Sequence, residues 1–162
     1  MKTALGFAQG TDAFEVGKRA AERAKQQVAK PDIAIMYASM AYDQNELFKG
    51  VKDTLGSIPV YGTTSPLVIT NRGVNRDAVV LMLVESNEIN FQIVAGRCND
   101  APGEIARYLG AQIMFDLSPQ PGEKVSCLLT GPESHGRGID YIEGLKKAWP
   151  YPLPISGGAT EY

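Results

Sequence analysis

The first 62 residues alternate between apolar runs of strand length and amphipathic segments of helix length, and this alternation constrains the fold more than any other feature. The apolar runs cover residues 3–8, 33–38 and 59–61, and residues 12–29 and 44–55 have helical spacing. The run at 33–38 is apolar throughout, as in a strand that is covered on both faces. This β-α-β-α-β order predicts parallel strands joined by right-handed helical crossovers.

Both predicted helices carry local start signals. Asp12 stands three residues before Glu15, in the spacing of a capping box. Asp43 stands three residues before Glu46 in the same way. Gly56 follows the second helix and is of the residue type favoured just after a helix C-terminus.

The pattern changes in the second half of the chain. Residues 79–85 and 89–94 are predicted strands separated by Ser-Asn-Glu, which indicates an antiparallel hairpin. The elements expected after them are a helix at 103–116, a strand at 124–130, a helix at 139–148 with Ile139, Ile142 and Leu145 facing inward, and a turn at 156–160. We therefore expect an α/β fold, with a mixed, mostly parallel sheet of about seven strands, helices packed on it and one antiparallel hairpin. The sequence shows no internal repeat.

The charge and the apolar runs exclude several classes of partner. Lysine and arginine total 16 against 18 acidic residues, so a nucleic-acid partner would lack the basic surplus that it needs. The apolar runs are far too short to span a membrane. Gly6, Gln9 and Gly10 interrupt the apolar core that a signal peptide would need. We expect a cytoplasmic protein with no nucleic-acid or membrane partner.

Metal and cofactor motifs are missing from the sequence. His135 is its one histidine, and Cys98 and Cys127 have neither metal-binding nor redox spacing. In a chain expected to be cytoplasmic, these two cysteines are expected to be free thiols. The sequence also lacks the Gly-Lys-Ser/Thr of a phosphate-binding loop. We therefore expect no metal site and no cofactor.

Small polar residues gather where the predicted strands end, which is where open α/β sheets bind ligands. Glycine lets the backbone approach a ligand, and hydroxyl groups both donate and accept hydrogen bonds. We expect Gly62 and Gly157 to serve the ligand more than the fold. The predicted ligand-binding residues are Ser39, Tyr42, Gly62, Thr63, Thr64, His135, Gly157, Gly158 and Thr160. Ordinary strand-to-helix turns favour the same residue types, so a purely structural role remains the alternative.

An enzyme is a second hypothesis. His135 follows a predicted strand and would act on a small substrate with Ser39 or with a threonine at 63–64. Such an enzyme requires these groups to meet within about 3 Å of each other or of the substrate. Neither Ser39 nor Cys127 lies in the Gly-x-Ser-x-Gly turn of a nucleophile elbow. We therefore assign no catalytic residue.

Several stretches, taken in order, resemble the N-terminal domain of the FIST family. These stretches are Pro31–Ser39 with the following Tyr42-Asp43, the strand Asp77–Met82, the Pro-x-x-Gly-Gly-Ala pattern of Pro154–Ala159, and Ile58–Thr64, which resembles the family's Pro-Val-x-Gly-x-Thr-Thr turn. The family's turn usually continues with Gly-Glu, whereas this chain continues with Ser65-Pro66-Leu67.

The resemblance implies a sensory domain for signal transduction. We expect residues 1–162 to form a single FIST N-terminal-like domain that lacks the family's C-terminal companion domain. The expected function is binding of a small ligand, such as an amino acid or a related small polar metabolite, without turnover. A downstream signalling domain or protein would be its partner. A protein-interaction scaffold is a third hypothesis.

Overall fold

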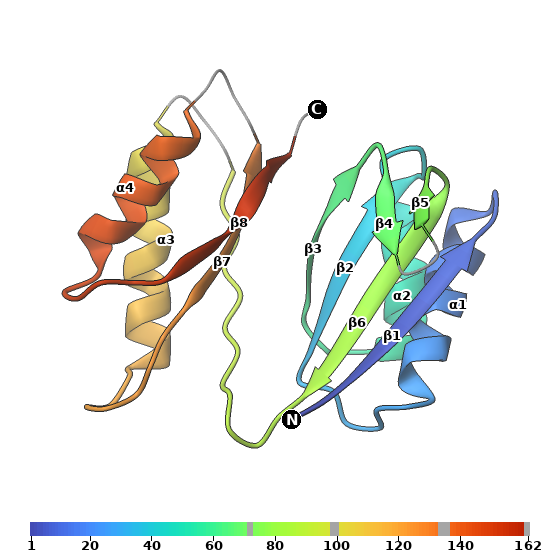
Figure 1. Cartoon of the computed structure of the whole chain (residues 1–162), viewed down its shortest axis with the longest axis horizontal. Coiled ribbons are helices and arrows are strands. Elements are labelled where there is room, and N and C mark those ends of the chain that lie inside the picture. The colour runs from blue at the N-terminus through green and yellow to red at the C-terminus, as the bar shows by residue number, and fades with distance from the viewer. Residues whose placement is uncertain (71–72, 98–100, 133–136, 161–162) are drawn as a thin grey trace. The chain divides into compact units, whose positions relative to one another are not determined.

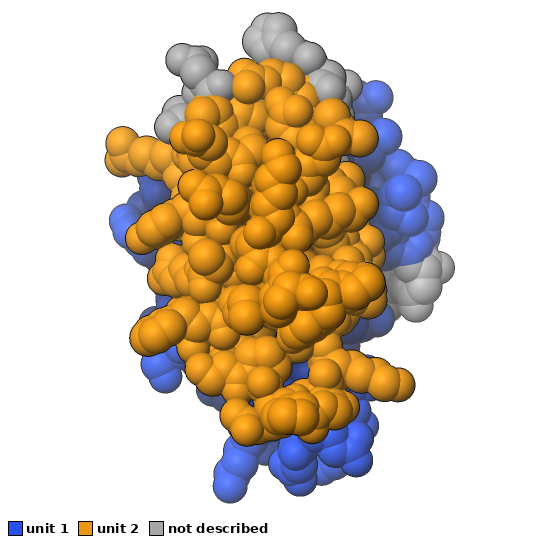
Figure 2. All heavy atoms as spheres, turned by 90° about the vertical axis from the view of Figure 1, so that its left-hand side faces the viewer, with its two compact units in different colours: residues 1–91 blue, residues 92–162 orange. Residues whose placement is uncertain are grey.

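The computed structural model describes residues 1–70, 73–97, 101–132 and 137–160, and divides into two compact units. The first unit covers residues 1–91 and the second covers residues 92–162; Figure 2 gives them different colours. Each unit is an α/β arrangement with a sheet of its own. The following paragraphs treat the units one at a time.

The first unit is built on a four-stranded sheet with the order β1-β6-β2-β3 (Figure 1). Its elements are β1 (Lys2–Gln9), α1 (Ala13–Lys25), β2 (Ile33–Ser39), α2 (Gln44–Leu55), β3 (Val60–Ser65), β4 (Val68–Thr70), β5 (Gly73–Asn75) and β6 (Ala78–Glu85). Strands β2 and β3 are parallel, as predicted, and β6 runs antiparallel to both β1 and β2. Strands β4 and β5, which the sequence analysis missed, form a separate antiparallel pair.

The prediction of a sheet of about seven strands with a hairpin at 79–94 is wrong. Strand β6 lies between β1 and β2, and residues 89–94 form no strand. The polar turn after β6 has another role: the Ser86 amide donates to Asp32 Oδ2 at 2.7 Å, and Ser86 Oγ accepts from the Glu88 and Ile89 amides. These bonds hold the turn against the start of β2 and do not close a hairpin.

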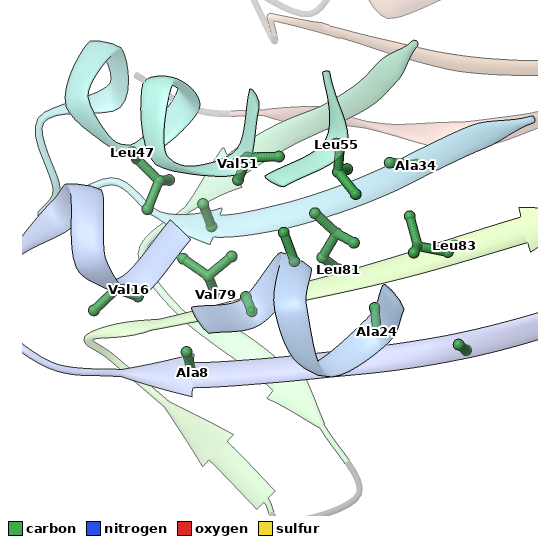
Figure 3. Packing of buried hydrophobic residues seen from close by; sticks show 14 of the residues in the cluster. Ala8, Val16, Ala24, Ala34, Leu47, Val51, Leu55, Val79, Leu81 and Leu83 are labelled. Carbon is green, nitrogen blue, oxygen red and sulfur yellow. The ribbon is translucent and has the colours of Figure 1, made fainter. Parts of the chain in front are cut away.

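Helices α1 and α2 cover one face of this sheet (Figure 1). Alternate residues of each strand point to that face, because side chains alternate along a strand. Figure 3 shows how Val79, Leu81 and Leu83 of β6 lie among the apolar side chains of both helices. The predicted caps are present: Asp12 Oδ1 accepts from the Glu15 amide, and Asp43 Oδ1 accepts from the amides of the first turn of α2.

Glycines let the two helices touch backbone to backbone. A Cβ at Gly17 would overlap the carbonyl oxygen of Leu47, and a Cβ at Gly50 would overlap that of Phe14. Both glycines are buried. The short distance between α1 and α2 therefore requires glycine at both positions.

The second unit contains α3 (Pro102–Leu117), β7 (Cys127–Pro132), α4 (Gly138–Ala148) and β8 (Ile155–Thr160). Strands β7 and β8 are parallel, and α3 packs against α4. The turn predicted at 156–160 is wrong, because these residues pair with β7 as a strand. The predicted inward face of α4 is confirmed at Leu145 and wrong at Ile139. Ile139 is 63% exposed, whereas Tyr141 and Leu145 are buried and, with the buried Gly144, give the spacing of a buried helical face.

The first prediction concerns helix packing in the first unit. Alanine at an exposed glycine of a helix would add about 1 kcal/mol of stability. We expect Gly50→Ala to do the opposite and to lower the free energy of unfolding by about 1 kcal/mol or more, because the new methyl group overlaps the α1 backbone. Urea unfolding followed by far-UV circular dichroism measures the change, with exposed Lys49→Ala as the control. A Gly50→Ala variant more stable than the wild type would contradict this packing.

Candidate functional site

The second unit contains a cavity of about 300 Å³ beside the paired strands β7 and β8 and the first half of α4. Two of the predicted site residues, Gly157 and Gly158, line it. The sequence analysis did not assign the other lining residues to the site; they are Leu129, Gly131, Gly138, Tyr141, Ile142, Ile155 and Ser156. The clearest signal for them was the combination of glycine-rich strand ends with the inward face of α4.

The lining of this cavity is mostly apolar. Leu129, Tyr141, Ile142 and Ile155 contribute aliphatic and aromatic side chains, and Ser156 contributes a hydroxyl group. Among the residues that the structure describes, no charged side chain lines the cavity. Such a surface suits the apolar part of a small molecule, because an unpaired buried charge would be strongly unfavourable there.

The two adjacent glycines of β8 have different roles. Gly157 has a φ of +145°, and a Cβ there would overlap the carbonyl oxygen of Leu129 in β7. Gly157 is therefore required for the close pairing of the two strands, and this requirement exists without any ligand. A Cβ at Gly158 would meet no atom within 4 Å, so this residue leaves open space at the cavity.

The start of α4 differs from the starts of α1 and α2. Its N-cap residue is Arg137, whose side chain makes no capping hydrogen bond to the first turn. The Arg137 guanidinium instead pairs with Asp140 at 3.1 Å. Among the described residues, the cavity is therefore bordered by a helix start that carries a cation in place of a capping carboxylate.

A second, more polar cavity of about 420 Å³ lies in the first unit. It is lined by the residues that begin α1 and α2: Thr11, Asp12, Ala13, Phe14, Ala41, Tyr42, Asp43 and Glu46. The predicted site residue Tyr42 belongs to it, and its hydroxyl group donates to the carbonyl oxygen of Gly10 at 2.9 Å. Burial raises the pKa of Tyr42 above the usual range, because the phenolate would lose its hydration. Tyr42 thus joins the segments that follow β1 and β2.

The remaining predicted residues of the first unit do not line this cavity. Ser39 is 2% exposed, and its Oγ accepts from the Ala41 amide at 3.2 Å. Gly62, Thr63 and Thr64 lie within β3 and pair with β2, so the turn predicted there is wrong. A Cβ at Gly62 would overlap the carbonyl oxygen of Met36, which makes this glycine, like Gly157, a requirement of strand pairing.

Two predicted residues are not characterised by the structure. His135 lies outside the described residues, so its pairing with Ser39 in an enzyme stays a hypothesis. Thr160 is the last residue of β8, and the structure describes only its backbone, which pairs with Pro132. The predicted set is thus divided between the two units: Gly157 and Gly158 share one cavity, and Tyr42 lines another.

Metal-binding and thiol chemistry find little support in the described ranges. They contain no group of three or more His, Cys, Asp or Glu side chains that could hold a metal ion. Cys127 is a free, half-buried cysteine in β7, and burial raises the pKa of its thiol, which disfavours the reactive thiolate. Cys98 lies outside the described residues. No helix among the described residues has the length and apolar character needed to cross a membrane.

The chain is an α/β protein, because helices pack against a mixed sheet in the first unit and against a parallel strand pair in the second. The cavity lies beside the parallel strand pair. The chain belongs to the FIST N domain family, whose model matches residues 32–161, which confirms the resemblance seen in the sequence. This is a family of sensory domains of signal transduction. No curated protein matches the chain in a sequence comparison.

The second prediction separates the two glycines of β8. We expect Gly157→Ala to lower the free energy of unfolding by about 2 kcal/mol, because it combines a strained φ with overlap of the β7 backbone. Gly158→Ala should stay within about 0.5 kcal/mol of the wild type. Trp149, the chain's one tryptophan, lies buried in the second unit and reports its unfolding by fluorescence. Equal stability of the two variants would refute the distinction.

The third prediction concerns Tyr42. Tyr42→Phe removes the hydrogen bond to Gly10 and should lower the free energy of unfolding by about 1 kcal/mol at pH 7. Because the folded protein holds the phenol proton above the ordinary pKa of about 10, the unfolded chain loses that proton first as the pH rises. The stability advantage of the wild type over Tyr42→Phe should therefore shrink above pH 10. Urea unfolding at pH 7 and across the alkaline range measures both effects, and an advantage that grows with pH would contradict the burial of this hydroxyl group.

Proposed function

We propose that this chain is a sensory domain that binds a small molecule, without turnover, in the cavity of the second unit. The observation that carries the proposal is the cavity itself, which is lined by the parallel strands β7 and β8 and by the beginning of α4. In α/β proteins the carboxyl ends of parallel strands are the usual place for ligands. The membership of the chain in a family of sensory domains supports the same conclusion.

The proposed ligands are amino acids and closely related small metabolites. An aliphatic or aromatic side chain would enter the cavity between Ile142 and Ile155, where water is replaced by apolar contacts. The charged groups of the ligand would stay at the edge of the cavity, because described residues provide no charged partner inside it. We therefore place leucine, isoleucine and phenylalanine ahead of aspartate and lysine as ligands. A downstream signalling domain or protein would receive the signal.

The fourth prediction tests ligand binding directly. Thermal unfolding of the whole chain, followed by Trp149 fluorescence, would be measured with L-leucine, L-isoleucine, L-phenylalanine, L-aspartate and L-lysine. A ligand at 100 times its dissociation constant adds about 2.7 kcal/mol of stability, which gives a clear rise in melting temperature. We expect such a rise with one or more of the first three amino acids and none with the last two.

A cavity-filling variant makes this test specific for the site. Gly158→Val places two methyl groups at the cavity and should remove the rise in melting temperature while the variant stays folded. Ser126→Val adds an apolar side chain at an exposed position outside the cavity and should keep the rise. The proposal fails if none of the apolar amino acids stabilises the wild type, or if Gly158→Val responds as the wild type does.

A further inference from the structure

The two units share one order of elements. The first contains α1-β2-α2-β3, and the second contains α3-β7-α4-β8 (Figure 1). In each unit the two strands are parallel neighbours and the two helices pack against each other. The order alone is common in α/β proteins, so equivalence of the units has to be shown residue by residue.

The strand pairs match in register. In the first unit the Ala34 amide donates to the carbonyl oxygen of Pro59 at 2.9 Å, and in the second the Cys127 amide donates to that of Pro154 at 2.8 Å. Each proline precedes the second strand of its pair. Three residues after each proline comes a glycine whose Cβ would overlap the neighbouring strand, Gly62 in β3 and Gly157 in β8.

The helix pairs match as well. Gly50 of α2 and Gly144 of α4 stand at the same position counted from the starts of their helices. A Cβ at Gly50 would overlap the carbonyl oxygen of Phe14 in α1, and a Cβ at Gly144 would overlap that of Gly103 in α3. The buried positions around these glycines also coincide: Leu47 and Val51 in α2 correspond to Tyr141 and Leu145 in α4.

The sequence analysis found no internal repeat, and the match between the units lies in backbone contacts and not in residue identities. Few residue identities survive between the units, since the core positions keep their burial and change their side chains. The conserved part of the pattern is the set of backbone contacts at Gly50, Gly62, Gly144 and Gly157. These contacts join residues that are far apart in the sequence, so they can be recognised only in the three-dimensional structure.

The units differ at the positions that line the cavity of the second unit. Gly131 and Gly158 correspond to Ala38 and Thr63 by strand register, and Gly138 corresponds to Gln44 as the first residue of its helix. The Gln44 amide nitrogen donates to the carbonyl oxygens of Ser39 at 3.0 Å and Tyr42 at 2.8 Å. In the first unit a side chain thus extends across the end of β2, whereas the corresponding Gly138 leaves open space.

We propose that the chain contains two copies of one α-β-α-β unit, and that the second copy forms the ligand site because it lacks side chains which the first copy has at the corresponding positions. This inference rests on the proposed function for the identity of the site. Gly138 is then a specificity-determining residue, since it leaves free the volume that Gln44 occupies in the first copy.

The comparison of the copies also gives the chemistry of the ligand. In the first copy the Asp43 carboxylate accepts hydrogen bonds from the amides of Asn45 and Glu46 at 2.9 and 3.1 Å. The second copy has Arg137 at the position of Asp43. The Asp140 amide, which corresponds to that of Glu46, donates to the carbonyl oxygen of Arg137 at 3.0 Å, so the place for a ligand carboxylate is the positive end of α4 beside the Ile139 amide. A small molecule that carries a carboxylate beside an aliphatic group would place the carboxylate there and fill the cavity with its apolar part. L-leucine and 4-methyl-2-oxopentanoate have this chemistry.

The fifth prediction transfers the residue of the first copy to the second. We expect Gly138→Gln to fold, to melt at or above the wild-type temperature, and to bind L-leucine and 4-methyl-2-oxopentanoate at least tenfold more weakly than the wild type. Glu143→Gln introduces the same residue on the exposed side of α4 and should bind as the wild type does. L-leucinamide, which lacks the carboxylate, should bind at least tenfold more weakly than L-leucine. Calorimetry measures the affinities.

The outcomes separate this inference from the proposed function. If no probe stabilises or binds the wild type, the proposed function and the ligand site fail together, and the repeat is judged by stability alone. Equivalence of the copies then requires that Gly144→Ala lower the melting temperature as Gly50→Ala does, and that Gly138→Gln stay folded. If the wild type binds L-leucine but Gly138→Gln binds it equally well or unfolds, the inference is overturned while the proposed function stands. Equal binding of L-leucinamide would overturn the carboxylate assignment.

Discussion

Close contact between backbones at glycine is the constraint on which both units depend. Gly50 and Gly144 let a helix touch its neighbour without an intervening side chain, and Gly62 and Gly157 do the same for neighbouring strands. A side chain at any of these positions would overlap the backbone of the neighbouring helix or strand. The whole element would then have to move, because a change of one side-chain rotamer would not relieve the overlap. The distances between neighbouring helices and between neighbouring strands therefore depend on glycine at these four positions. These distances in turn determine how much space is left at the ends of the elements.

The two cavities differ in chemistry because the helix starts beside them are closed differently. In the first unit the helix starts are closed by carboxylates and by Tyr42, whose hydroxyl group binds the segment after β1. The side chains of Asp12, Tyr42 and Asp43 beside that cavity are therefore engaged with the protein itself. In the second unit Gly138 and Gly158 face open space, and the start of α4 has no side-chain cap from the described residues. A small apolar carboxylate would complete the second unit in the way that the chain's own side chains complete the first.

The sequence predicts local features well and long-range features poorly. Asp12, Asp43 and Gly56 mark helix ends through contacts with residues close in the chain, and the structure confirms all three. The position of β6 between β1 and β2 depends on pairing with residues far away in sequence, so the local hairpin signal after it was misleading. Gly157 and Gly158 appeared equivalent in the sequence, because nothing local distinguishes a glycine that contacts a neighbouring strand from one that borders a cavity.

The cavity of the second unit leaves the apolar side chains of Ile142 and Ile155 partly exposed, which forgoes the stabilisation that burying them would give. The first unit shows that this layout of helices and strands accommodates a side chain at the position of Gly138, since Gln44 stands there with its amide hydrogen-bonded. Glutamine is also the better helix former. Filling the cavity is therefore both compatible with the fold and favourable for folding alone. Glycine at this position forgoes that stabilisation in the free protein, and the small molecule proposed above would offset the loss by mass action. The stability of the second unit would then depend on the concentration of that ligand.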